Sequence, residues 1–134
     1  MRTILISGAS RGIGNSIAKQ ALKDGHRISL GVRDPDKLIG SEFDPKKVGE
    51  SKVLICKYDA NDNKSAKIWV EKTVSHFQKI DCIINCAGIF KNTPFDFKDN
   101  EVEDLEELWK TNIMGPWYLI KEAWKELIKT DNSR

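Results

Sequence analysis

Little in this 134-residue sequence points to a disulfide framework or a metal centre. The three cysteines, Cys56, Cys82 and Cys86, are odd in number and show no paired zinc-ligand spacing, and His26 and His76 are isolated from them. We therefore interpret the cysteines as buried free thiols of a protein that works in a reducing cytoplasm, and we expect no metal site.

Long apolar runs and a strong charge imbalance are also missing. No apolar run approaches the roughly 18 residues that span a bilayer, and the stretch from Met1 to Gly8 is too short for the apolar region of a signal peptide. A net charge of +2 is too small to favour nucleic acid or an anionic membrane as a partner. With 40% apolar and 31% charged residues, residues 1–134 are expected to form one soluble domain.

Apolar runs and helical spacing alternate along the chain. The predicted strands cover residues 3–7, 27–32, 53–58 and 80–85. The predicted helices cover residues 13–23, 63–77 and 102–129, with a short helix possible within 37–43 and loops at 44–51 and 88–100. A break is expected near Thr111, and Gly115-Pro116 should kink the last helix or leave the carbonyls of the preceding turn unpaired.

The order of these elements predicts an α/β fold. Strands that are apolar almost throughout, with helices between them, indicate a parallel sheet that is covered on both faces. Right-handed crossovers then give the strand order 3-2-1-4 for the four strands present. A ligand crevice is expected between the first and fourth strands.

A glycine-rich turn joins the first strand to the first helix. In Ser7-Gly8-Ala9-Ser10-Arg11-Gly12-Ile13-Gly14, one glycine would permit a tight turn, one would let the backbone approach a pyrophosphate, and one would allow helix and strand to pack closely. The helix that follows offers unpaired N–H groups and a partial positive charge. A plain tight turn is the alternative, but the position at the first strand–helix junction favours a phosphate site.

Together with three later motifs, this turn resembles the signature T-G-x-x-x-G-x-G of the short-chain dehydrogenase/reductase family, with Ser7 in place of threonine. Asp59-Ala60 ends the third strand, where the family places an aspartate that binds the adenine amino group. Asn85-Cys86-Ala87-Gly88 ends the fourth strand and is similar to the family's N-N-A-G. Asn112 matches the asparagine of the family's catalytic tetrad.

The resemblance implies a Rossmann-type doubly wound sheet and hydride transfer between a nicotinamide cofactor and a carbonyl or alcohol. An NAD enzyme carries an acid at the end of the second strand, whereas an NADP enzyme carries cations there. The acidic position aligns with Val32, Arg33 follows it, and Arg11 supplies a second guanidinium, so NADP(H) is predicted over NAD(H). Asp34, about 20 residues beyond the last glycine, is the rival that would favour NAD(H), and a solvated turn is the third possibility.

One catalytic residue, Asn112, and a set of cofactor-binding residues are predicted from these motifs. The predicted cofactor site consists of Gly8, Ser10, Arg11, Gly12, Ile13, Gly14, Arg33, Asp59, Ala60, Asn85, Ala87 and Gly88.

The family's catalytic Tyr-x-x-x-Lys is absent from this sequence. Tyr58 is followed four places on by Asp62, and Tyr118 by Glu122. The resemblance places the catalytic serine, tyrosine and lysine after the next strand, so we expect this chain to be the cofactor-binding front half, truncated after the fourth strand and the long helix, and inactive alone. The edge of the fourth strand would then be unpaired. The alternatives are a stand-alone dinucleotide-binding module and an interaction domain whose glycine turn holds nothing.

The long helix also bears on partners. Its apolar residues exceed what one sheet face can cover, and they are Trp109, Trp117, Tyr118, Leu119, Trp124 and Leu127. In the resembling family this helix packs against its mate in a dimer, which suggests a homo-oligomer through residues 102–129. Core packing is nevertheless the default for each single tryptophan. The other expected partners are the dinucleotide and a small carbonyl or alcohol substrate.

Overall fold

Four parallel strands form the centre of the computed structural model, which describes residues 1–92 and 101–134. They are β1 (Thr3–Ser7), β2 (Arg27–Val32), β3 (Val53–Lys57) and β4 (Cys82–Asn85). Their order is β3-β2-β1-β4, which confirms the predicted topology. All five residues of β1 are buried, because this strand lies inside the sheet and is covered on both faces.

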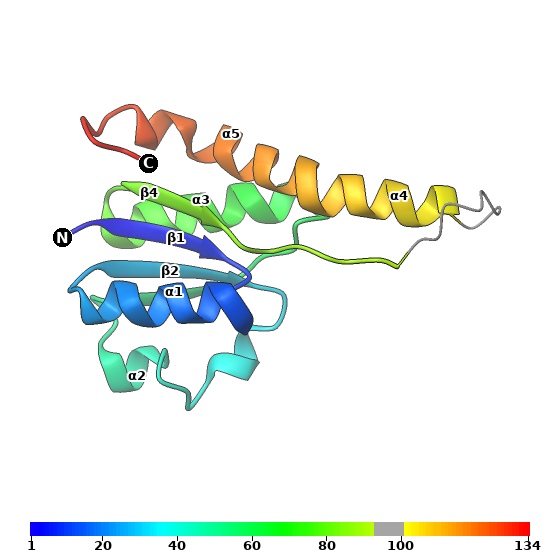
Figure 1. Cartoon of the computed structure of the whole chain (residues 1–134). Helices are drawn as coiled ribbons and strands as arrows, with labels where there is room; N and C mark the ends of the chain where they lie inside the picture. The colour runs from blue at the N-terminus through cyan, green and yellow to red at the C-terminus, as the bar shows by residue number, and fades with distance from the viewer. Residues whose placement is uncertain (93–100) are drawn as a thin grey trace.

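Helices cover both faces of this sheet (Figure 1). One face carries α1 (Gly12–Lys23), the 3-10 turn η1 (Pro35–Leu38) and the short helix α2 (Pro45–Val48). The other face carries α3 (Asn63–Phe77) and α5 (Gly115–Leu127). Each face therefore has its own hydrophobic core, and the strand residues alternate between the two.

The segment after β2 differs from the expectation of a loop over residues 44–51. Pro45–Val48 is helical, and the short helix expected within 37–43 is instead the η1 turn at Pro35–Leu38. Asp44 is the N-cap residue of α2, and its carboxylate accepts hydrogen bonds from the backbone N–H of Gly40 at 2.7 Å and of Lys46 at 2.9 Å. These bonds hold the pKa of Asp44 below its ordinary value. Four residues are too few to show helical periodicity, so the cap and the proline were the only signals.

The long C-terminal helix contains a π-helical turn where a break was expected. It consists of α4 (Glu101–Trp109), the π segment η2 (Lys110–Met114) and α5, which continue one another as a rod whose α4 end projects beyond the sheet (Figure 1). Pro116 lies in the first turn of α5, where its missing N–H is tolerated. The irregular turn thus keeps Gly115-Pro116 inside one continuous helical segment. The predicted loop at 88–100 has no regular structure over 88–92, and residues 93–100 lie outside the described part of the chain.

The last residue of the chain lies along the outer edge of β4. The N–H of Arg134 donates to the carbonyl of Asp81 at 3.1 Å, and the N–H of Ile83 donates to the carbonyl of Arg134 at 3.0 Å. The strand edge that was expected to be unpaired therefore has a hydrogen-bonded neighbour at its start. Within residues 1–92 and 101–134, no helix combines the length and apolar character that a membrane crossing requires.

Candidate functional site

A groove of about 590 Å³ opens at the carboxyl ends of the strands, the end where parallel α/β sheets bind ligands. It is lined by the glycine turn, the end of β2, the turn after β3, the segment after β4, and residues of α4 and η2. Every predicted cofactor residue except Asn85 lines this groove. The fold therefore gathers residues from Gly8 to Gly88 around one cavity.

The glycine turn is held together by two very close approaches. A Cβ atom on Gly8 would lie 2.7 Å from the backbone nitrogen of Ala87, and one on Gly14 would lie 2.6 Å from the carbonyl oxygen of Gly8. Gly8 also has a φ of 70°, in the left-handed region. The expected tight turn and close helix packing thus have specific steric causes.

Gly12 differs because the space beside it is open. Its φ is 60°, and no heavy atom lies within 4 Å of where its Cβ would be. It begins α1 directly after Arg11, which is the N-cap residue and makes no side-chain capping hydrogen bond. The first turn of α1 contains no acidic residue either. The donor end of this helix is therefore left to the groove, which fits a bound phosphate.

Ser7 connects the glycine turn to the segment after β4. Its hydroxyl oxygen accepts hydrogen bonds from the N–H groups of Cys86 and Ala87, each at 3.1 Å, and the residue is only 1% exposed. Burial raises the pKa of the Cys86 thiol, as it does for Cys56 and Cys82, and all three cysteines are free. Cys56 is buried as expected, whereas Cys82 and Cys86 are only half-buried, and Cys86 lines the groove.

The two asparagines of the predicted site do not line the groove. Asn85 is exposed at the end of β4, beside Ser7 of β1. The amide of Asn112 is bonded to the backbone of Ile89, whose N–H donates to Oδ1 and whose carbonyl accepts from Nδ2, both at 2.9 Å. Asn112 thus ties the π turn to the segment after β4, and the roles predicted for both asparagines stay predictions.

The end of β2 carries more charge than the sequence motifs suggested. Val32 is buried at the strand's end, so no acid occupies the aligned position. Arg33 and Asp34 are exposed and line the groove, and they are joined there by Lys37 from η1. Sequence reasoning missed Lys37, because no motif extends that far and only the η1 turn brings it to the groove.

The turn after β3, which contains Asp59, contacts the helical segment around Thr111 and Gly115, which is far away in the sequence. Tyr58 packs against Trp69, with ring centroids 4.9 Å apart, and its hydroxyl donates to the carbonyl of Gly115 at 3.4 Å. Burial, with a smaller effect of the Asp59 charge, raises the pKa of Tyr58 to about 12, so the phenol stays protonated. The hydroxyl of Thr111 donates to Oδ1 of Asn61 at 2.8 Å.

Asp59 itself is held by the turn that follows β3. Its Oδ1 accepts from the N–H of Asn61 at 2.9 Å, and the hydroxyl of Ser65 binds the backbone of Asp59. Gly115 lets α5 approach this turn, because a Cβ there would lie 2.7 Å from the Cβ of Ala60. The π turn therefore positions the part of the groove that contains Asp59-Ala60. The Gly115-Pro116 pair was the one sequence signal of this contact.

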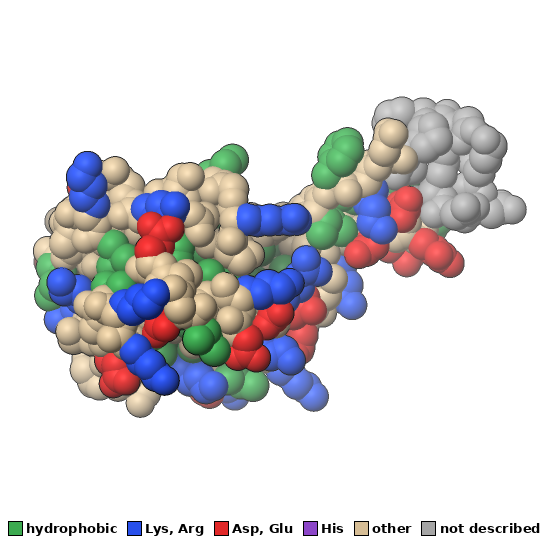
Figure 2. Space-filling model, turned by 90° about the horizontal axis from the view of Figure 1, so that it is seen from below, with side chains coloured by type: hydrophobic (Ala, Val, Ile, Leu, Met, Phe, Trp, Pro, Cys, Tyr) green, Lys and Arg blue, Asp and Glu red, His purple; other side chains and the backbone are tan. Residues whose placement is uncertain are grey.

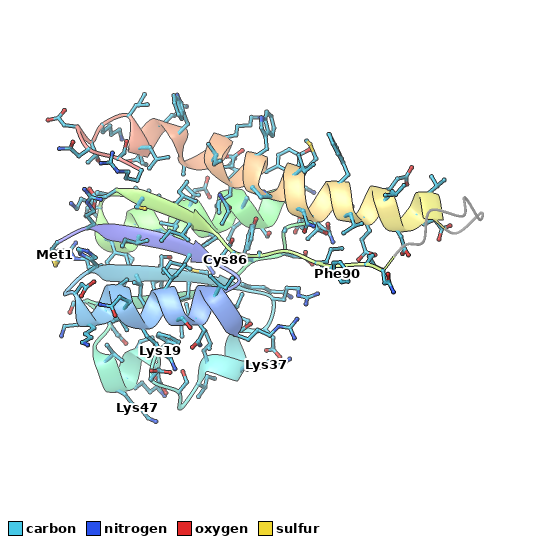
Figure 3. All side chains as sticks on the ribbon, in the orientation of Figure 1. Met1, Lys19, Lys37, Lys47, Cys86 and Phe90 are labelled. Atoms are coloured by element: carbon cyan, nitrogen blue, oxygen red, sulfur yellow. The ribbon has the colours of Figure 1, made fainter. Side chains whose placement is uncertain are left out.

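Lys91 fastens the segment after β4 to α4. Its ammonium lies 3.2 Å from Oδ1 of Asp104 and 2.7 Å from Oε2 of Glu107, which itself lines the groove. The hydrogen bonds to Glu107 and Asp104 raise the pKa of Lys91 above its ordinary value. Asn112 and Lys91 thus hold opposite ends of one short extended segment, which follows Cys86 in Figure 3.

Known proteins of one family resemble this chain over nearly all of its length. The family model for short chain dehydrogenases matches residues 2–134. The 11-beta-hydroxysteroid dehydrogenase-like 3 protein of Arabidopsis thaliana is 31% identical over 130 residues, which are 96% of this chain and 41% of that protein. Agropine synthesis reductase of Rhizobium rhizogenes is 34% identical over 131 residues, which are 98% of this chain and 29% of that protein.

A solved structure agrees with the fold as well. The glucose/ribitol dehydrogenase of Brucella melitensis, a short-chain dehydrogenase/reductase, superposes with a TM-score of 0.80 at 27% identity, covering 93% of this chain and 52% of that one. The chain thus spans less than two thirds of the length of each of these proteins. Because the family model matches the whole segment that builds the groove, this chain belongs to the short-chain dehydrogenase family.

Proposed function

We propose that the groove binds NADP(H) and that this chain supplies the cofactor-binding half of an oxidoreductase, whose bound nicotinamide exchanges a hydride with a carbonyl or alcohol substrate. The observation that carries this proposal is the open backbone at Gly12. It lies at the uncapped N-terminus of α1 and is flanked in the groove by Arg11 and Arg33. Backbone donors and a helix N-terminus suit the pyrophosphate, and guanidinium groups suit the additional phosphate of NADP(H).

Two arginines at the end of β2 and in the glycine turn support NADP(H) over NAD(H). The 2′-phosphate would carry a charge of about −1.5 to −2 near neutral pH, and Arg11 and Arg33 both line the groove where it would lie. Val32 offers no carboxylate for the ribose hydroxyls. Asp34 is the acid that would favour NAD(H), but it shares this end of the groove with more cations than acids.

Residues after β3 and after β4, which lie on opposite sides of β2 and β1 in the sheet, would position the adenine and the nicotinamide, respectively. One carboxylate oxygen of Asp59 accepts a hydrogen bond from the Asn61 N–H, and the family resemblance implies that this carboxylate would bind the adenine amino group. Asn112 holds the Gly88–Ile89 backbone through its two bonds to Ile89. We propose that Asn112 acts by fixing this segment, and that the chain alone binds cofactor without turnover, because it has no Tyr-x-x-x-Lys.

The test is the affinity of purified protein for NADPH and NADH, measured by calorimetry with Arg33→Asp. We expect the substitution to weaken NADPH binding by at least tenfold, because a charge-assisted bond of about 1.5–3 kcal/mol is replaced by repulsion. NADH binding should change much less. Lys67→Asp, on the outer surface of α3, is the control for the change in charge. An equal loss for both dinucleotides, or no loss, would contradict the proposal.

We further propose that two copies associate through α4 and α5, in a reducing compartment such as the cytoplasm, which suits the three free thiols. Leu119 and Leu127 are buried, but Trp109, Trp117 and Trp124 are each more than half exposed, against the default of core packing. With Ile113 and Ile120 they follow helical spacing along one side of the rod. Such a stripe of large apolar side chains is typical of an association surface.

Sedimentation velocity tests this association. Trp117→Glu should convert a dimer into a monomer, whereas Ile68→Glu, which changes an exposed apolar residue of α3, should not. A wild-type protein that is monomeric at all concentrations would refute the proposed interface.

A further inference from the structure

Lys37 brings a third positive charge to the end of β2. The η1 turn that carries it is anchored by Leu38, which is 3% exposed and belongs to the hydrophobic core beneath α1. Because Leu38 fixes the turn, the neighbouring Lys37 is held at the groove that it lines, below the N-terminal end of α1 (Figure 3). Elsewhere on the face that carries α1 and α2, basic and acidic side chains are interspersed (Figure 2).

Asp34 is the partner of Lys37. The Lys37 Nζ atom lies 3.7 Å from Oδ2 of Asp34, and the two residues are three positions apart on the η1 turn. Asp34 occupies the N-cap position of this turn, yet its side chain accepts no capping hydrogen bond from the backbone. The charge of the carboxylate is therefore balanced by the ammonium group of Lys37 instead of by backbone N–H groups.

Asp34 has a consequence for the dinucleotide. A carboxylate near the end of β2 accepts hydrogen bonds from free ribose hydroxyls and repels a 2′-phosphate. Asp34 lines the groove together with Arg33, so without a balancing cation the negative charge of Asp34 would offset the positive charge of the Arg33 guanidinium. We propose that Lys37 is a specificity-determining residue that neutralises Asp34 and thereby keeps the site selective for the 2′-phosphate of NADP(H). This inference rests on the proposed function.

A double-mutant cycle tests the inference. The affinities of the 134-residue protein for NADP⁺ and NAD⁺ are measured by calorimetry at low salt for wild type, Lys37→Gln, Asp34→Asn and the double variant. Lys37→Gln should weaken NADP⁺ binding about threefold to fivefold, as fits an exposed ion pair, and should change NAD⁺ binding less. In the Asp34→Asn background, Lys37→Gln should have less than half of that effect. Lys67→Gln is the matched control, since it breaks an exposed Lys67–Glu71 pair of 3.9 Å outside the groove.

Three results would overturn the role of Lys37. If Lys37→Gln leaves the ratio of the two affinities unchanged while Arg33→Asp lowers it, the proposed function stands and the role of Lys37 is wrong. If the loss on Lys37→Gln is the same with and without Asp34, Lys37 contacts the phosphate directly and does not act through Asp34. If wild type binds NAD⁺ as tightly as NADP⁺, both the cofactor proposal and the inference are wrong. Circular dichroism of each variant confirms that it is folded.

Discussion

Two glycines at opposite ends of α1 allow the proposed phosphate binding to be tested separately from the cost of backbone strain. Gly12 has a φ of 60° and Gly25 a φ of 79°, and at both positions no heavy atom lies within 4 Å of where a Cβ would be. Only Gly12 lines the groove. Gly12→Ala and Gly25→Ala are therefore matched in conformation and in free space, and they differ in whether the added methyl group meets a bound dinucleotide.

The expected magnitudes follow from this difference. An alanine in the left-handed region costs about 1–2 kcal/mol, and neither methyl group has a neighbour to clash with, so both variants should lose similar amounts of unfolding free energy. At Gly12 the methyl group would keep a phosphate from the backbone. Losing one charge-assisted hydrogen bond of about 1.5–3 kcal/mol weakens binding by about tenfold to a hundredfold. Gly25→Ala should leave binding unchanged.

Urea denaturation measures the two stability losses, and calorimetry with NADP⁺ measures the two affinities. If Gly12→Ala bound NADP⁺ as tightly as Gly25→Ala does, the proposed phosphate contact at Gly12 would be wrong. That result would mean that no phosphate approaches the backbone at this position. A stability loss several kcal/mol larger for Gly12→Ala would show that its methyl group is not in open space.

Two further predictions concern stability. Asp81→Ala should lower the unfolding free energy at pH 7 by about 1–3 kcal/mol, because it leaves the buried N–H of Thr3, now bonded at 2.6 Å, without an acceptor. Burial alone would raise the pKa of Asp81, but the hydrogen bonds from Lys79 and Thr3 outweigh burial and lower this pKa. The stabilisation by Asp81 is therefore present above about pH 4 and is lost as the pH falls through the lowered pKa. Urea titrations of wild type and Asp81→Ala at pH 7 and pH 3 check this pH dependence, and a stability difference that does not shrink in acid would contradict it. Gly31→Ala should cost about 1–3 kcal/mol, because its Cβ would lie 2.5 Å from the fully buried Trp69 ring; an unchanged melting temperature would contradict this steric argument.

The sequence was sufficient to predict the sheet and the longer helices. The β1, β2 and α3 bounds match the predicted ranges, because each is a clear apolar run or a helical repeat bounded by turn residues. The strand order followed from the handedness of the crossovers. These features depend on local pattern and on chain geometry that all parallel sheets share.

The remaining features depend on contacts between distant segments. The π turn at Lys110–Met114 is accompanied by the approach of Gly115 to Ala60, which no local pattern contains. Lys37 reaches the groove because Leu38 is buried. The sequence motif predicted a catalytic role for Asn112, which stays a prediction, but it did not indicate the two bonds of its amide to the backbone of Ile89. A sequence motif identifies such a residue but does not show which of its possible hydrogen bonds the fold uses.

The central position of β1 has a consequence for how the protein folds. Thr3 and Asp81, which are hydrogen-bonded between β1 and the start of β4, are 78 residues apart, whereas the register of β1 with β2 pairs Thr3 with Arg27. Closing the longer loop costs more chain entropy, so the β1–α1–β2 unit should form before β4 joins it. The glycine turn would then exist early, but Ala87 and Gly88 on the other side of the groove arrive only with β4. A newly made chain should therefore be unable to bind a dinucleotide in this groove until β4 has joined the sheet.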